Sequence, residues 1–175
     1  QCLLILLLKV LGRIMTNIYE IKDVLNQYEI KDVHQKLLEE NWRIDTPYDP
    51  VSIYHPTFKV CFDNMILNPY WFGYFTALVS GINSSLRKEK NFDLGFYKIS
   101  SIILNAQQKN DKFQFHDHRD CRHTMVGFLT PEWDQSWGGS LQVQDKEIKF
   151  SPGNFVLFSG NDLHDAMPVK VNLPF

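Results

Sequence analysis

Two imidazoles and one carboxylate in the C-terminal half of the chain could hold a metal ion. His118 and Asp120 are two positions apart, and side chains at that spacing share one face of an extended strand. The apolar run Pro152–Phe158 and the polar corner Ser159–Asp162 are typical of a buried strand and a turn, which would deliver His164 onto the next strand. Two imidazoles and one carboxylate form the facial triad that binds non-haem Fe(II) with open coordination positions. The spacing therefore predicts a metal site of His118, Asp120 and His164.

A further histidine, His116, precedes His118 by two positions and shares its face. We interpret His116 as a substrate contact or a hydrogen-bond partner of the site, because the triad needs a carboxylate two places after its first histidine. A cupin is the alternative, since cupins bind a metal through an H-x-H pair and a distant histidine. Cupins of this pattern place a glutamate about four residues after the pair, whereas residues 121–123 are Cys, Arg and His. The cupin alternative stays open, in second place.

Four motifs in a fixed order carry a resemblance to a known family. They are His118-x-Asp120, Trp133-x-x-x-Trp137-Gly138-Gly139-Ser140-Leu141, Pro152-Gly153-Asn154-Phe155-Val156-Leu157-Phe158 and His164-x-x-x-Pro168-Val169. From about Phe96 onward the chain resembles the catalytic core of the Fe(II)/2-oxoglutarate oxygenases, in particular the prolyl-4-hydroxylase-like group. The resemblance implies a double-stranded β-helix, which is a jelly roll, with Fe(II), 2-oxoglutarate, O2 and ascorbate as cofactors. It also implies hydroxylation of a peptidyl proline or a small molecule, with decarboxylation of 2-oxoglutarate to succinate.

The co-substrate residues are only partly present in this resemblance. The family binds the distal carboxylate of 2-oxoglutarate through a basic residue, usually arginine, ten or more positions after the second histidine, because the guanidinium fork clamps a carboxylate. No arginine follows His164 in the sequence, and we expect it beyond Phe175. Lys170 shares a face with His164 on a regular strand and is a candidate for this role. Thr124 matches a family threonine that lines the pocket, and Trp137 could form a wall of the substrate entrance.

The elements that must position these residues are short strands preceded by helices. Strand-like composition is found at residues 94–105, 113–120, 123–130, 140–144, 147–150, 154–159 and 164–171. Turn residues separate these segments, which is typical of a jelly roll or barrel. Helical spacing predicts amphipathic helices at 17–28, 32–40 and 69–87. The expected fold is mainly β with N-terminal helices (α+β): a double-stranded β-helix that lacks its last strand.

The 175 residues predict a single domain with three parts. Residues 15–90 are the expected helical support, and residues 91–175 are the expected catalytic core, truncated at its C-terminus. Residues 1–14 form an apolar leader that we expect to lie outside the native domain, with the natural start at Met15.

Charge and cysteine content limit the partners and the setting. The formal net charge of −2 offers no basic field for nucleic acid. The apolar run Cys2–Val10 is too short to span a bilayer. Three cysteines without paired spacing predict no disulfide framework and favour a reducing, cytoplasmic setting. We therefore expect a small-molecule or peptide substrate, no nucleic acid and no membrane, with a non-catalytic jelly-roll binding module as the other alternative function.

Overall fold

The structure is a computed structural model that describes residues 2–11, 17–40, 43–45, 57–62, 68–107, 109 and 115–171. Its strands are β1 (Cys2–Leu11), β2 (Tyr19–Ile21), β3 (Arg43–Asp45), β4 (Thr57–Phe62), β5 (Phe96–Ala106), β6 (His123–Phe128), β7 (Leu141–Val143), β8 (Lys146–Ile148), β9 (Phe155–Ser159) and β10 (His164–Ala166). Its helices are α1 (Gln27–Leu38), α2 (Pro69–Lys90) and the short 3-10 helix η2 (Gln135–Trp137). The expectation of a mainly β chain with helices in its first half is confirmed.

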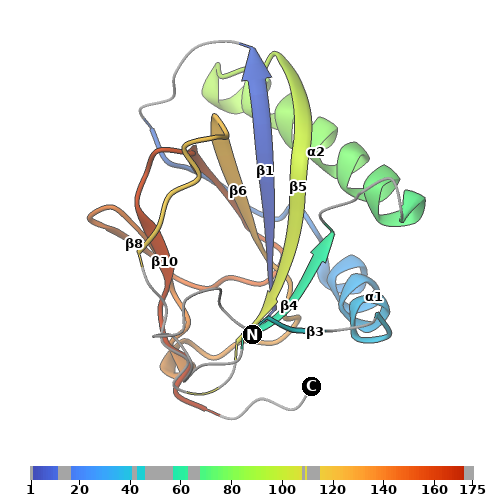
Figure 1. Cartoon of the computed structure of the whole chain (residues 1–175), viewed down its shortest axis with the longest axis vertical. Coiled ribbons are helices and arrows are strands. Elements are labelled where there is room, and N and C mark those ends of the chain that lie inside the picture. The colour runs from blue at the N-terminus through green and yellow to red at the C-terminus, as the bar shows by residue number, and fades with distance from the viewer. Residues whose placement is uncertain are drawn as a thin grey trace.

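The strands form two antiparallel sheets. The large sheet has the order β2-β9-β6-β1-β5-β4-β3, and the small sheet has the order β10-β7-β8. Helices α1 and α2 lie on one side of the large sheet, and β8 and β10 lie on the other (Figure 1). The interior between the two sheets therefore lies on the face of the large sheet that the helices leave open.

The two helices begin at asparagine caps and bury one apolar stripe each. Asn26 and Glu29 form a capping box at the start of α1, and the Asn68 side chain caps α2, with Pro69 in its first turn. Helix α1 buries Ile30, Val33 and Leu37, and α2 buries Trp71, Phe75, Val79, Ile82 and Leu86. The stripe of α2 that contains Trp71 and Phe75 is therefore part of the core.

The predicted helix over residues 17–28 is wrong for most of its length. Tyr19 and Ile21 pair with Leu157 and Phe155 of β9, so this segment forms β2, and the helix begins only after Asn26. The hydrogen bonds with β9 stabilise a strand here more than a helical pattern of only three turns stabilises a helix. Local spacing therefore predicted the wrong element where a neighbouring strand was available.

Strand β1 is the central strand of the large sheet. It pairs with β5 on one side and with β6 on the other. Its side chains from Leu3 to Leu6, together with Leu8, are buried, and burial of one leucine stabilises the folded chain by about 1.5–3 kcal/mol. The sequence-based expectation placed residues 1–14 outside the domain, whereas Cys2–Leu11 supplies backbone partners to both β5 and β6.

Several expectations concern residues outside the described ranges. These are the start at Met15, the first two residues of the strand expected at 113–120, and the end of the chain at Phe175. Within the described ranges, no helix combines the length and the apolar character that crossing a membrane requires.

Candidate metal centre

His164 is the first residue of β10, and its ring contacts a backbone carbonyl. Its Nδ1 lies 3.0 Å from the Asp162 carbonyl oxygen, which can only accept, so Nδ1 carries the proton and Nε2 is the free acceptor. The residue is only 2% exposed, and Nε2 is buried without a hydrogen-bond partner. Metal-binding histidines commonly give their other N–H to a carbonyl, which fixes both the tautomer and the ring. His164 is therefore oriented as a metal ligand.

The loop from Ser159 to Asp162 fixes the position of this carbonyl. The Asp162 carboxylate accepts from the backbone N–H of Ser159 at 3.2 Å and from the side-chain amide of Gln144. Burial raises the pKa of Asp162 above its ordinary value. These contacts join the loop to the β7–β8 turn and hold the residue that orients His164.

The segment His116–His118 lies beside His164 because the two backbones pair. The His116 N–H donates to the His164 carbonyl at 3.2 Å, and the His164 N–H donates to the His116 carbonyl at 3.0 Å. The His118 N–H donates to the Gly160 carbonyl at 2.7 Å. A Cβ added to Gly160 would sit 2.7 Å from the His118 carbonyl oxygen, so glycine at this position permits the close approach.

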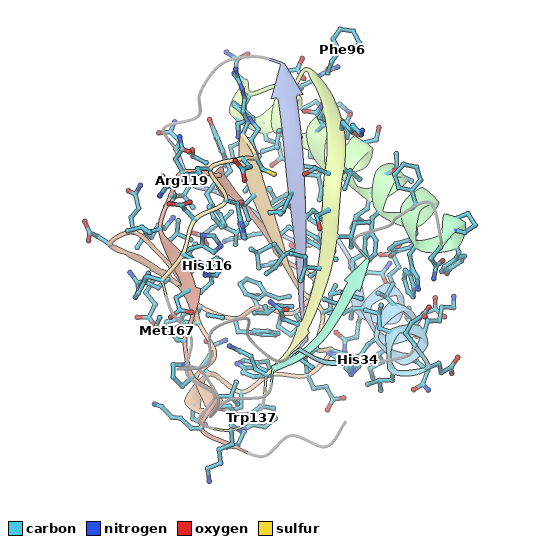
Figure 2. The ribbon with its side chains drawn as sticks, in the orientation of Figure 1. His34, Phe96, His116, Arg119, Trp137 and Met167 are labelled. Atoms are coloured by element: carbon cyan, nitrogen blue, oxygen red, sulfur yellow. The ribbon has the colours of Figure 1, made fainter. Side chains whose placement is uncertain are left out.

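The three imidazole rings converge, and we call His116, His118 and His164 the histidine cluster. Ring centroids are 5.0 Å apart for His116–His118, 4.4 Å for His116–His164 and 4.9 Å for His118–His164. One ring nitrogen from each residue can be chosen so that all lie within 4.8 Å of one another. Figure 2 shows His116 close to strand β10. Three nitrogens at this spacing can surround one divalent ion.

Burial keeps the deepest histidine neutral. Exposure falls from His116, which is exposed, through His118 to the buried His164. Burial lowers the pKa of His164 to about 4, with a smaller effect from the neighbouring histidines. The imidazole is therefore unprotonated at pH 7, as a metal ligand must be.

The carboxylates of the loop lie outside the cluster. Asp120 is exposed and is not among the side chains that converge there. Asp117 pairs with Arg119, whose Nε donates to Oδ1 at 2.9 Å. This pairing lowers the pKa of Asp117 to about 2. Of the expected set His118, Asp120 and His164, the structure brings the two histidines together and adds His116. The sequence suggested His116 as a substrate contact or a hydrogen-bond partner, and as a ligand in the cupin alternative.

Thr124 lies behind the cluster. It is fully buried on β6, and its hydroxyl lacks a hydrogen-bond partner. Thr124 pairs with Phe158 of β9, and the Phe158 ring lies 4.9 Å from the ring of His164. Side chains that are directly opposite on paired strands share a face, so Thr124 lines the same interior region.

Lys170 and Trp137 lie in another part of the molecule. Trp137 contacts Trp133 edge-to-face at 5.5 Å, and the Lys170 N–H donates to the Trp137 carbonyl at 2.8 Å. The Lys170 side chain is exposed and runs over Gly138. Figure 2 places Trp137 well away from His116, towards the bottom of the view. The structure thus does not bring Trp137 to the histidine cluster.

Comparison with known proteins agrees with this geometry. Residues 104–173 match the family model of the 2OG-Fe(II) oxygenase superfamily, and this range contains all three clustered histidines. The resemblance to this superfamily is confirmed. No curated protein is significantly similar to the chain.

A solved structure extends the likeness to the fold of nearly the whole chain. It is a prolyl-4-hydroxylase from Pseudomonas putida, matched with a TM-score of 0.62 and 16% sequence identity over 88% of this chain and 87% of that chain. At this identity the likeness establishes the fold alone. The prolyl-4-hydroxylase-like resemblance of the motifs is therefore matched by the arrangement of strands and helices.

Proposed function

We propose that this protein is an Fe(II)- and 2-oxoglutarate-dependent dioxygenase built on a jelly roll, the double-stranded β-helix. The observation that carries the proposal is the histidine cluster, which lies inside the region that matches the oxygenase family. Its substrate would be a peptidyl proline or a small molecule that presents a C–H bond. Bound Fe(II), with 2-oxoglutarate and O2, supplies the oxidising power for hydroxylation and yields succinate and CO2, and ascorbate keeps the iron reduced.

His118 and His164 are the ligands on which sequence and geometry agree. Both are neutral-imidazole donors suited to Fe(II) when unprotonated. The third ligand is Asp120 by the sequence pattern and His116 by the geometry. In either case three positions of a six-coordinate ion would stay open, because the chain supplies three donors.

The histidine cluster is covered by buried side chains on one side and is exposed to solvent on the other. Thr124 and Phe158 are buried behind His164, so they exclude water from that side of the ion. His116 is exposed, and the substrate would therefore approach past His116. Low polarity behind the ion and access from one side suit a reaction that must exclude stray water.

The experiment that tests the proposed function is release of succinate. Purified protein is incubated with Fe(II), ascorbate, O2 and 2-oxoglutarate, and succinate is quantified with and without candidate prolyl peptides. We expect succinate that depends on 2-oxoglutarate and is lost in His164→Ala. Metal binding without any succinate release would contradict the proposal.

The three-histidine arrangement favours one second candidate, a cupin-type metalloprotein. His116, His118 and His164 are the histidines that the cupin pattern uses, and the structure brings all three together. Such a protein would bind the metal and ignore 2-oxoglutarate, so the same succinate assay separates the two functions.

A further inference from the structure

We infer that one end of the large sheet binds the surface of an anionic lipid bilayer. This region lies away from the histidine cluster, and the inference does not depend on the proposed function. Three observations support it: an almost fully exposed phenylalanine, four exposed basic side chains that form no ion pairs within the described ranges, and the strand pairing that brings them to the same end of the molecule.

Phe96 projects from the fold instead of packing into it. It is the first residue of β5 and is 88% exposed, whereas Ile99, further along the same strand, is only 6% exposed. Figure 2 shows the Phe96 ring pointing away from the ribbon at the top of the view. Because a large apolar side chain gains free energy when it leaves water, this ring favours an apolar environment outside the protein.

Basic side chains lie on the elements beside this ring, and we call Phe96, Lys88, Lys90, Lys98 and Arg122 the basic tip. All four basic side chains are exposed, and none of the ion pairs within the described ranges includes them. Basic residues in the last turn of a helix interact favourably with its dipole, which accounts in part for Lys88 and Lys90 in α2. The dipole does not account for Lys98 on β5 or for Arg122 just before β6.

The strand pairing brings the basic residues to the same end of the large sheet. Lys98 lies directly opposite Lys9 of β1, and the backbone N–H of Arg122 donates to the carbonyl of Leu8, also in β1, at 3.1 Å. Because β1 lies between β5 and β6, the backbones of Lys98 and Arg122 are two strand spacings apart, which is about 10 Å. The connection after α2 leads directly to the start of β5, and Figure 1 shows these two elements meeting at the top of the view.

The charge of the basic tip differs from that of the whole chain. Two exposed acids lie beside its four basic side chains, Glu89 in α2 and Asp120 two positions before Arg122. A third acid, Asp93, is already paired with Arg87 at 2.8 Å. The tip therefore carries an excess of positive charge, although the formal net charge of the chain is −2. The expectation of no membrane partner follows from that net charge and does not apply to this end of the molecule.

A lipid surface fits this arrangement better than a folded protein does. A ring that is 88% exposed would need a preformed cavity in a folded partner, whereas a bilayer deforms around it. Aromatic side chains insert at the boundary between headgroups and acyl chains, and basic side chains beside them contact anionic headgroups. One ring with a few basic side chains gives weak, reversible attachment. His116 lies well away from Phe96 in Figure 2, so attachment leaves the histidine cluster open to a dissolved substrate.

The test is co-sedimentation of the full-length chain with lipid vesicles. Vesicles of equal parts phosphatidylcholine and phosphatidylserine should bind the protein, and vesicles of phosphatidylcholine alone should not. Binding should be lost in about 1 M salt, where screening limits electrostatic attraction to about 3 Å.

Variants at exposed positions measure the contribution of each part of the basic tip. Phe96→Ala should weaken vesicle binding about tenfold or more, because no ring leaves water on binding. Lys98→Ala should weaken it about fivefold, as expected for one basic residue near an anionic surface. The matched controls are Tyr28→Ala, which removes an equally exposed ring from α1, and Lys149→Ala, which removes an exposed lysine next to β8. Both controls should bind as wild type does, and circular dichroism checks that every variant is folded.

A second measurement reports insertion into the bilayer directly. The fluorescence emission of Phe96→Trp should shift to shorter wavelength when the mixed vesicles are added, because the indole ring leaves water. Tyr28→Trp should show no such shift, and equal shifts in the two variants would contradict the inference.

Absence of vesicle binding, or equal binding to the two kinds of vesicle, would overturn the inference. Wild-type binding by Phe96→Ala or Lys98→Ala would also overturn it. If the tip instead binds polyglutamate or a DNA oligonucleotide and no vesicles, its partner belongs to another class and the assignment to lipid is wrong.

Discussion

Two ring clusters in the C-terminal half differ in how their polar atoms are satisfied. In the aromatic cluster of Trp133, Trp137 and Phe150, the Trp133 ring stacks on Phe150 at 4.1 Å, and its indole N–H donates to the Gly138 carbonyl at 3.1 Å. In the histidine cluster, His164 leaves a buried nitrogen without a partner. A ring cluster whose polar atoms are paired stabilises the fold, whereas one that holds an unpaired buried nitrogen is prepared for a ligand. The comparison separates a cluster whose indole N–H is paired from the cluster that we propose as the metal site.

The largest effect is expected from the aromatic cluster, and it concerns stability. Trp133→Ala removes the stack on Phe150 and leaves a cavity, so the free energy of unfolding should fall by about 3 kcal/mol. Urea denaturation measures this loss. Co2+ affinity of the folded variant should not change, and a parallel loss of metal binding would break the distinction between the two clusters.

The next effect concerns the histidine cluster and metal affinity. His164→Ala removes the most buried donor, so Co2+ affinity should fall by at least about 100-fold, which is about 2.8 kcal/mol. Equilibrium dialysis with quantified metal provides the measurement. The metal-free variant should unfold close to the wild-type urea concentration, because the mutation removes an unsatisfied buried nitrogen along with packing. A variant that binds Co2+ normally would remove His164 from the site.

A smaller effect is expected where the two backbone segments of the histidine cluster meet. Gly160→Ala places a Cβ against the carbonyl oxygens of His118 and Cys121, and overpacking of this kind costs about 1–3 kcal/mol. Because the same contact positions His118, Co2+ affinity should fall together with stability. Asn161→Ala, at the neighbouring exposed position, is the control and should leave both unchanged. If Gly160→Ala lowers stability alone, the loop does not position the site.

The last effect is a pH dependence of the metal-free protein. His164 has a pKa of about 4 in the fold because of burial, against about 6.5 when unfolded. The unfolded state therefore binds the extra proton first, and stability falls as the pH decreases from 6.5 to 4, by up to about 1.4 kcal/mol per pH unit.

His164→Gln should reduce this pH dependence, as measured by urea denaturation at several pH values. His123, which burial also brings to a pKa of about 4, contributes equally to both proteins. Identical pH profiles for the two proteins would show that His164 is not held neutral by the fold.

The sequence predicted the features that depend on local signals. Helix α2 begins at Pro69, the first residue of the helix predicted at 69–87, and His164 follows the predicted strand and corner. Asp120 differs from expectation because strand alternation was assumed across a turn that only the His118–Cys121 hydrogen bond reveals. The H-x-H spacing of His116 and His118 was the signal for the third ring, but its convergence with His164 depends on a register between distant segments.

The same limit applies to the N-terminal half. Residues 17–28 carry a helical pattern, but Tyr19–Ile21 within them joins β9. Cys2–Leu11 joins two strands that come much later in the chain. Apolar composition shows that such segments must be buried. It does not identify the strand beside which each one lies.

The position of β1 has a consequence for folding kinetics. Cys2 pairs with Ala106, and Leu3 pairs with Phe128, so this segment must wait for partners that are synthesised much later. Contacts between such distant residues slow folding. Until they form, an apolar segment stays open to aggregation, and refolding from urea should be slow and improve on dilution of the protein.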